Sequence, residues 1–202
     1  DAISIAWPSI LESFLVALVG VIDTIMVGTV GPAAIAAVGL CTQPKFIALA
    51  LFISTNVAVS AIVARRRGQG NRDSANSVLL QAFSGTLLLV AFISVIAVAF
   101  APQILRLAGT NQDTHQQAVA YYRVIMGGLF FNVCSLVINA AQRGAGNTKI
   151  AMRTNLVSNL VNICFNYLLI GGHFGFPRLG VTGAALATVI GTVAAFLMSL
   201  YS

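Results

Sequence analysis

The stretch FLVALVGVIDTIMVGTV, residues 14–30, is apolar except for small and hydroxyl side chains and one acid, Asp23. About 20 mostly apolar residues suffice to cross the hydrocarbon core of a membrane as a helix. Hydrophobic residues make up 58% of the chain and charged residues 8%. A soluble domain carries about 25% charged residues, so this chain has too few to cover a water-exposed surface. The stretch therefore predicts a membrane-spanning helix.

Further apolar stretches follow along the 202 residues, separated by short polar or Gly/Pro-containing segments. The sequence predicts an all-α integral membrane protein, a single bundle of six transmembrane helices with no separate soluble domain. The expected spans are residues 3–30, 33–64, 77–101, 118–142, 150–171 and 181–201. The chain starts at Asp1 and stops inside an apolar run. We therefore expect it to be a piece of a longer protein.

The positive charges are distributed unequally between the two sides of the predicted bundle. Loops 65–76 and 143–149, with the residues beside them, hold seven Lys and Arg: Arg65, Arg66, Arg67, Arg72, Arg143, Lys149 and Arg153. The opposite side holds Arg106 and Arg178, with Arg123 just inside the fourth span. Cytoplasmic loops of membrane proteins are enriched in Lys and Arg. We therefore predict a multi-pass cell-membrane protein with loops 65–76 and 143–149 in the cytoplasm. The net charge of +6 then reflects topology and not a nucleic-acid partner.

Asp23 needs an explanation because a carboxylate inside a membrane costs several kcal/mol, ~3 by insertion scales, unless it is paired, solvated or protonated. One interpretation is a group that takes up and releases a proton. The other is a buried ion pair with Lys45 of the second span, although Lys45 also has the reach to extend toward the outer surface.

The fifth span carries the amides Asn155, Asn159, Asn162 and Asn166. At about 100° per residue they fall on one helix face, which should not face lipid. Hydrogen bonding between helices explains Asn155 and Asn159. For the deeper Asn162 and Asn166 a polar cavity is the better explanation, because an amide oxygen can coordinate a cation or accept a bond from a protonated carboxyl.

Other intramembrane polar residues extend this hypothesis. We take Gln43, Lys45, Asn139 and Asn159 as candidate cavity-lining residues. For Thr188 in the sixth span, a hydroxyl bonded back to its own helix is an equal alternative. No combination of nucleophile, base and orienting group is recognisable, so the sequence predicts no enzyme, no catalytic residue and no cofactor.

Several motifs together resemble the multidrug and toxic compound extrusion (MATE) family. The stretches VIDTIMVG (21–28) and AAVGL (36–40) resemble the first two spans of these transporters. Residues 64–71 and RGAGNTK (143–149) are similar to the family's loops after spans two and four. Residues 162–171 and GAALAT (183–188) resemble spans five and six. The resemblance covers nearly the whole chain, with the motifs in the expected order.

The resemblance implies the N-terminal lobe of a two-lobed, twelve-span transporter whose C-terminal lobe is absent from this chain. Such proteins export organic, often cationic, drugs or metabolites by alternating access, driven by H⁺ or Na⁺. By resemblance, Asp23, Asn162, Asn166 and Thr188 would couple the cation, with Na⁺ possible at Asp23 and Asn162. The expected partners are a small organic substrate, membrane lipid and the C-terminal half.

This chain departs from the family at Asn166, where many members have Asp. One carboxylate fewer makes a Na⁺ site less secure and favours protons. Two alternatives remain open. A flippase for a lipid-linked oligosaccharide, from the same superfamily, predicts a more cationic central cavity. A non-transporting structural membrane protein predicts Asp23 paired with Lys45 and shielded from water.

Overall fold

The computed structural model of the chain describes the backbone of residues 2–70 and 72–201, and their side chains except those of 2–9, 12 and 72–75. Within these residues every regular element is helical, which confirms the all-α fold class. The elements are α1 (Ala2–Gly28), α2 (Pro32–Gly68), α3 (Arg72–Ala99), α4 (Ala101–Leu107), α5 (Gln112–Gly127), α6 (Leu129–Gly144), α7 (Thr148–Gly171), the 3₁₀ turn η1 (His173–Gly175) and α8 (Val181–Tyr201).

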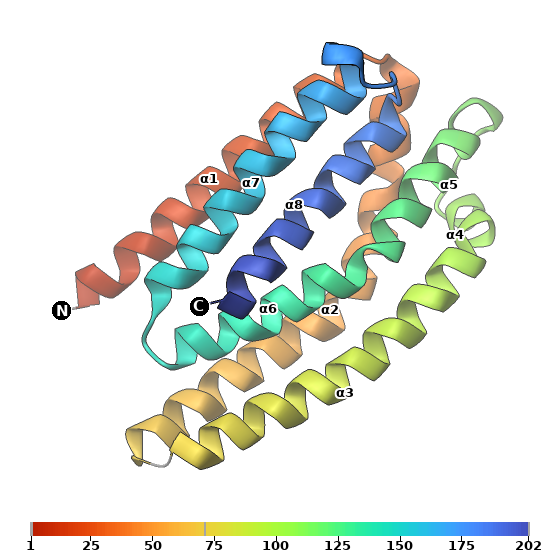
Figure 1. Cartoon of the computed structure of the whole chain (residues 1–202). Coiled ribbons are helices and arrows are strands. Elements are labelled where there is room, and N and C mark those ends of the chain that lie inside the picture. Colours follow the sequence, from red (N-terminus) through yellow and green to blue (C-terminus); the bar gives the residue numbers. More distant parts are fainter. Residues whose placement is uncertain (1, 71, 202) are drawn as a thin grey trace.

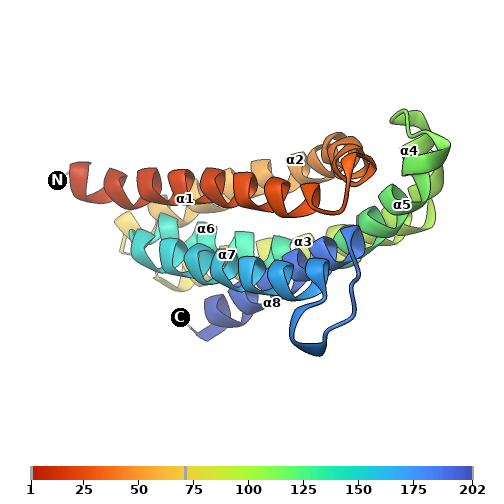
Figure 2. The same cartoon turned by 90° about the horizontal axis from the view of Figure 1, so that it is seen from above.

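The long helices lie side by side and run from one end of the molecule to the other (Figure 1). α7 and α8 pack along each other, and α1 lies against α7, which Figure 2 shows from above. On the other side, α2 contacts α3, α5 and α6. Both chain ends lie at the same end of the molecule as the α2–α3 and α6–α7 connections (Figure 1). This arrangement agrees with a topology in which both ends share the side of the arginine-rich loops.

The observed helix bounds differ from the predicted spans mainly at the connections. α2 continues to Gly68 and so includes three arginines that we assigned to loop 65–76. Position 71 and the side chains of 72–75, in the same loop, lie outside the described residues. The polar stretch after the third span contains α4, with Pro102 in its first turn, and the start of α5. Polar composition alone did not reveal these helical turns.

The predicted fourth span, 118–142, is two helices and not one. α5 and α6 meet at Gly128 with a bend of 44°. Paired glycines, here Gly127 and Gly128, are a common cause of sharp helix bends. A side chain at position 128 would collide with Val189 of α8, so the glycine at this position lets α8 approach closely.

Ser94 of α3 stabilises this bend. Its hydroxyl donates to the carbonyl oxygen of Met126 at 2.5 Å, in the last turn of α5, where carbonyl groups lose their intrahelical partners. We expect Ser94→Ala to lower the free energy of unfolding by about 1–3 kcal/mol, because a part-buried carbonyl would lose its hydrogen bond. Thermal unfolding of the purified protein measures this effect. Ser84→Ala is the matched control, since the Ser84 hydroxyl is exposed and bonds only to its own helix; equal unfolding temperatures for the two variants would contradict the role given to Ser94.

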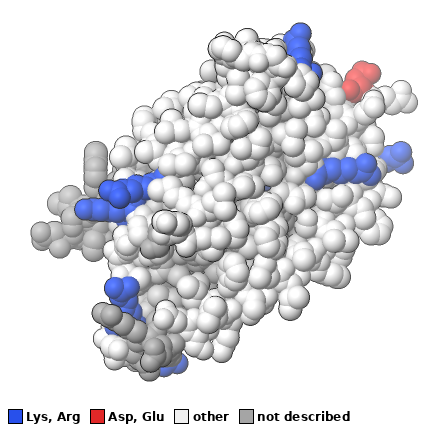
Figure 3. Space-filling view, viewed as in Figure 1, with Lys and Arg blue, Asp and Glu red and all other residues white. Residues whose placement is uncertain are grey.

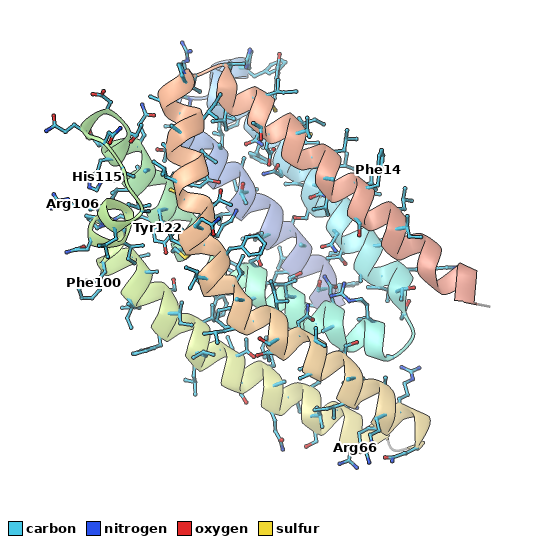
Figure 4. All side chains as sticks on the ribbon, turned by 180° about the vertical axis from the view of Figure 1, so that it is seen from behind. Phe14, Arg66, Phe100, Arg106, His115 and Tyr122 are labelled. Carbon is cyan, nitrogen blue, oxygen red and sulfur yellow. The ribbon has the colours of Figure 1, made fainter. Side chains whose placement is uncertain are left out.

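The surface of the bundle is suited to lipid. Large apolar side chains are exposed along the helices, such as Phe14 (64%), Leu88 (78%) and Val95 (69%). Figure 3 shows the charged side chains near the ends of one face, with a broad uncharged band between them. From behind, Phe14 points away from the bundle, while Arg66 lies at one end and Arg106 and His115 lie at the other (Figure 4).

Among the described residues, length and hydropathy alone identify three helices able to cross a membrane: α2, the part of α3 over Asn76–Ala99, and α8. The bent pair of α5 and α6 counts as a fourth. The apolar part of α1 with described side chains, Ser13–Gly28, is short of a full span. The four asparagines of α7 lower its mean hydropathy. α1 and α7 correspond to the first and fifth predicted spans, and both carry the polar residues discussed next.

Candidate polar site between α1, α7 and α8

The contact between α1 and α7 brings Asp23 and Asn166 together. Asp23 is half-buried, about one turn before α1 ends at Gly28. Asn166 is 1% exposed and its amide Nδ2 donates to Asp23 Oδ1 over 2.5 Å. The Asn166 Oδ1 atom is buried and has no hydrogen-bond partner in the described part of the chain. The carboxylate of the first span is thus hydrogen-bonded directly to Asn166, the most buried of the four α7 asparagines.

Asn162 lies one turn earlier on the same face of α7 and is also buried. The orientation of its amide, that is, which atom is oxygen and which is nitrogen, is assigned from the hydrogen-bond network. With Oδ1 toward α8, that atom accepts from the backbone N–H of Thr188 at 3.2 Å. Its Nδ2 then donates to Asp23 Oδ1 at 2.9 Å and lies 3.2 Å from Asn166 Nδ2, which is also a donor. In the opposite orientation, Asn162 Oδ1 accepts from Asn166 Nδ2 at 3.2 Å and its Nδ2 donates to Thr188 Oγ1 at 3.1 Å. In the first orientation two amide nitrogens converge on one carboxylate oxygen, and in both orientations Asn162 links Thr188 to the Asp23–Asn166 pair.

Thr188 supplies the contribution of α8. Its hydroxyl donates to the Ala184 carbonyl oxygen at 3.0 Å, and the same hydroxyl oxygen accepts from Asn162 Nδ2 at 3.1 Å when that amide faces it. The bond to its own helix and the contact with the predicted site therefore coexist. The structure brings together all four residues that we expected to couple a cation, Asp23, Asn162, Asn166 and Thr188.

A cavity of about 360 Å³, which we call the Asp23 cavity, opens beside these residues. Its walls include Asp23, Thr24, Lys45, Tyr121, Asn166 and Thr188. Lys45 lines the cavity from α2. No ion pair within 4.0 Å joins Lys45 to Asp23 in the described residues, so the predicted alternative of a direct pair is not formed.

Three candidate cavity residues lie elsewhere. Gln43 lines a separate apolar pocket of about 570 Å³ between α2, α3 and α4, because two residues before Lys45 is about 200° around the helix. Asn139 is 2% exposed and packed between α6 and α8, where Ser199 Oγ donates to its Oδ1 at 3.3 Å. Asn159 is half-buried on α7 and lines neither of these cavities. For Asn139 the structure gives interhelical bonding and not a cavity wall.

Tyr121 was missed by sequence reasoning. It is 8% exposed on α5 and forms part of the cavity wall. One aromatic residue in an amphipathic helix carries no sequence signal that separates a cavity wall from ordinary core. In the described residues, no group of three or more His, Cys, Asp or Glu side chains gathers as a metal site.

Comparisons with known proteins agree with this arrangement. The family model MatE matches residues 8–168. The chain is 31% identical over 196 residues to the probable multidrug resistance protein NorM of Thermotoga maritima, covering 94% of this chain and 41% of that protein. It is 31% identical to the probable multidrug resistance protein YoeA of Bacillus subtilis, covering 95% and 42% respectively.

A solved structure of a multidrug resistance MATE family transporter in the outward-facing conformation also superposes on the chain. The TM-score is 0.90 with 28% identity, covering 98% of this chain and 43% of that one. The chain thus spans about two fifths of the length of the relatives that it matches.

Proposed function

The chain belongs to the multidrug and toxic compound extrusion (MATE) family, and we propose that the protein carrying it is a cation-coupled antiporter that exports organic compounds by alternating access. The chain corresponds to the N-terminal half of the matched transporters. Its relatives are multi-pass membrane transporters and not enzymes. The export of drugs or metabolites, the small organic substrate and the pairing with a C-terminal half in contact with membrane lipid are part of the proposal.

We further propose that the coupling ion is H⁺. The supporting observation is that Asp23 is the one carboxylate on the described wall of the cavity, with the amide of Asn166 and no second acid beside it. A Na⁺ ion prefers several oxygen ligands, as hard cations do, and a wall with one carboxylate offers it little negative charge. A proton needs no such shell. It neutralises the carboxylate, whose charge is costly in the membrane.

Purified full-length protein in proteoliposomes tests this proposal. The probe is ethidium, a fluorescent organic cation, with either a pH gradient or a Na⁺ gradient imposed across the membrane. We expect the pH gradient to drive ethidium movement and the Na⁺ gradient at uniform pH to drive none. Movement on a Na⁺ gradient alone would refute proton coupling. No movement under either gradient would refute the antiport of organic cations.

The two alternatives have less support. A lipid-linked oligosaccharide flippase needs a cationic cavity, but the described walls of the Asp23 cavity carry one carboxylate and one ammonium. A purely structural role predicts a shielded Asp23 paired with Lys45. Instead, Asp23 borders a cavity of about 360 Å³ without a pair to Lys45.

A further inference from the structure

Lys45 is a charged residue inside the bundle, and the proposed proton coupling at Asp23 gives it no role. It is half-buried on α2, one residue after the helix-interior Pro44. An ammonium group at membrane depth is rare and usually marks a functional pathway or pairs with an acid. The only acid on the described cavity wall is Asp23, and it is not within ion-pair distance.

The Asp23 cavity therefore has two oppositely charged walls. Asp23 on α1 is held by donors from α7, which fix the position of its carboxylate. Lys45 on α2 has no hydrogen bond or ion pair to a described residue, so its ammonium is available to a ligand. A long, flexible side chain with three donors suits binding an anionic group at a variable position.

A second cavity of about 90 Å³ shares Lys45 and Thr188 with the first. Its walls also include Asn132, Thr192 and the α5–α6 bend at Gly128. Lys45 thus lies where the two hollows meet, with hydroxyl and amide groups around it. These neutral donors and acceptors can solvate a bound anionic group but cannot neutralise Lys45 themselves.

We propose that Lys45 is a specificity-determining residue that binds the carboxylate of a zwitterionic substrate whose cationic centre lies at Asp23. The inference rests on the proposed antiport. Antiport requires the substrate and the proton to compete for Asp23, and a cationic centre does so. A purely anionic substrate would bind more tightly when Asp23 is protonated, which gives co-transport in one direction instead of exchange.

A matched pair of dyes tests the inference in the purified full-length protein. Rhodamine 110 carries a carboxylate beside its cationic ring system, and rhodamine 123 is its methyl ester, a cation without the carboxylate. We expect Lys45→Gln to raise the Kd of rhodamine 110 about tenfold, the loss of one charge-assisted contact. The Kd of rhodamine 123 is expected not to rise, because this dye has no carboxylate for Lys45 to bind and loses only a like charge nearby.

Two further variants complete the experiment. Lys45→Arg keeps the charge and retains rhodamine 110 binding. Lys149→Gln makes the same chemical change on an exposed α7 residue outside both cavities and alters neither dye. An unchanged Kd for rhodamine 110 in Lys45→Gln, or an equal change for both dyes, overturns the inference; the equal change would make Lys45 a counter-charge for Asp23 or a packing residue.

The same dyes separate this inference from the proposed function. If wild-type protein moves rhodamine 123 on a pH gradient but Lys45→Gln binds both dyes normally, the antiport stands and the role of Lys45 falls. If neither dye moves while Lys45→Gln selectively loses rhodamine 110, the carboxylate site stands and the antiport falls.

Discussion

Full-length protein carrying Asp23→Asn is expected to insert and fold normally but to move substrate on a pH gradient no faster than protein-free vesicles do. Asn has nearly the same shape as Asp, and its amide oxygen can still accept from Asn166 and Asn162. It cannot take up a proton, and no other acid lies on the described walls of the cavity. Because antiport needs a group that alternates between proton and substrate, the coupling should be lost entirely.

Two measurements distinguish lost coupling from lost folding. Thermal unfolding should leave the Asp23→Asn protein at least as stable as the wild type, because a costly buried charge has been removed. Asp113→Asn, on the exposed first turn of α5, is the matched control and should transport normally. Proton-driven transport at the wild-type rate by the Asp23→Asn protein would refute the coupling role of Asp23.

The helical bundle and the centre of the candidate site could be predicted from the sequence for the same physical reason. Polar groups inside a membrane are costly, so each one indicates a partner or a cavity. Asp23 is isolated in an apolar stretch, and the asparagines of α7 recur on one helix face. These two patterns marked Asp23 and the α7 asparagines as residues that need a partner or a cavity, and the family resemblance implied that Asp23, Asn162 and Asn166 form one site.

Helical periodicity could not predict which neighbour each face meets. Gln43 and Lys45 are both polar and close in sequence, yet they face different pockets on α2. Asn139 is an intramembrane asparagine like those of the site, but it packs on Ser199 of α8. Gly127 and Gly128 are visible in the sequence, but the close approach of Val189 to Gly128 is a tertiary contact that composition does not encode.

The second large effect is expected for Gly191→Val in α8. A Cβ atom at this position would lie 2.7 Å from the Ser158 carbonyl oxygen and 3.2 Å from Asn162 Cβ. Both neighbours are on α7, and the Ser158 oxygen belongs to the backbone, so α8 must move away. Overpacking of this kind typically costs about 1–3 kcal/mol. We therefore expect a lower unfolding temperature in thermal melts followed by circular dichroism.

The same displacement should also reach the site, because Thr188 lies one turn before Gly191 and bonds to Asn162. Proton-driven transport is therefore expected to fall further than the stability loss alone would cause, measured at a temperature where the variant is still folded. Gly85→Val in α3 is the matched control, since nothing lies within 4 Å of a Cβ at that position. If Gly191→Val and Gly85→Val melted and transported alike, close packing of α8 on α7 would not be what holds Asn162 and Thr188 together.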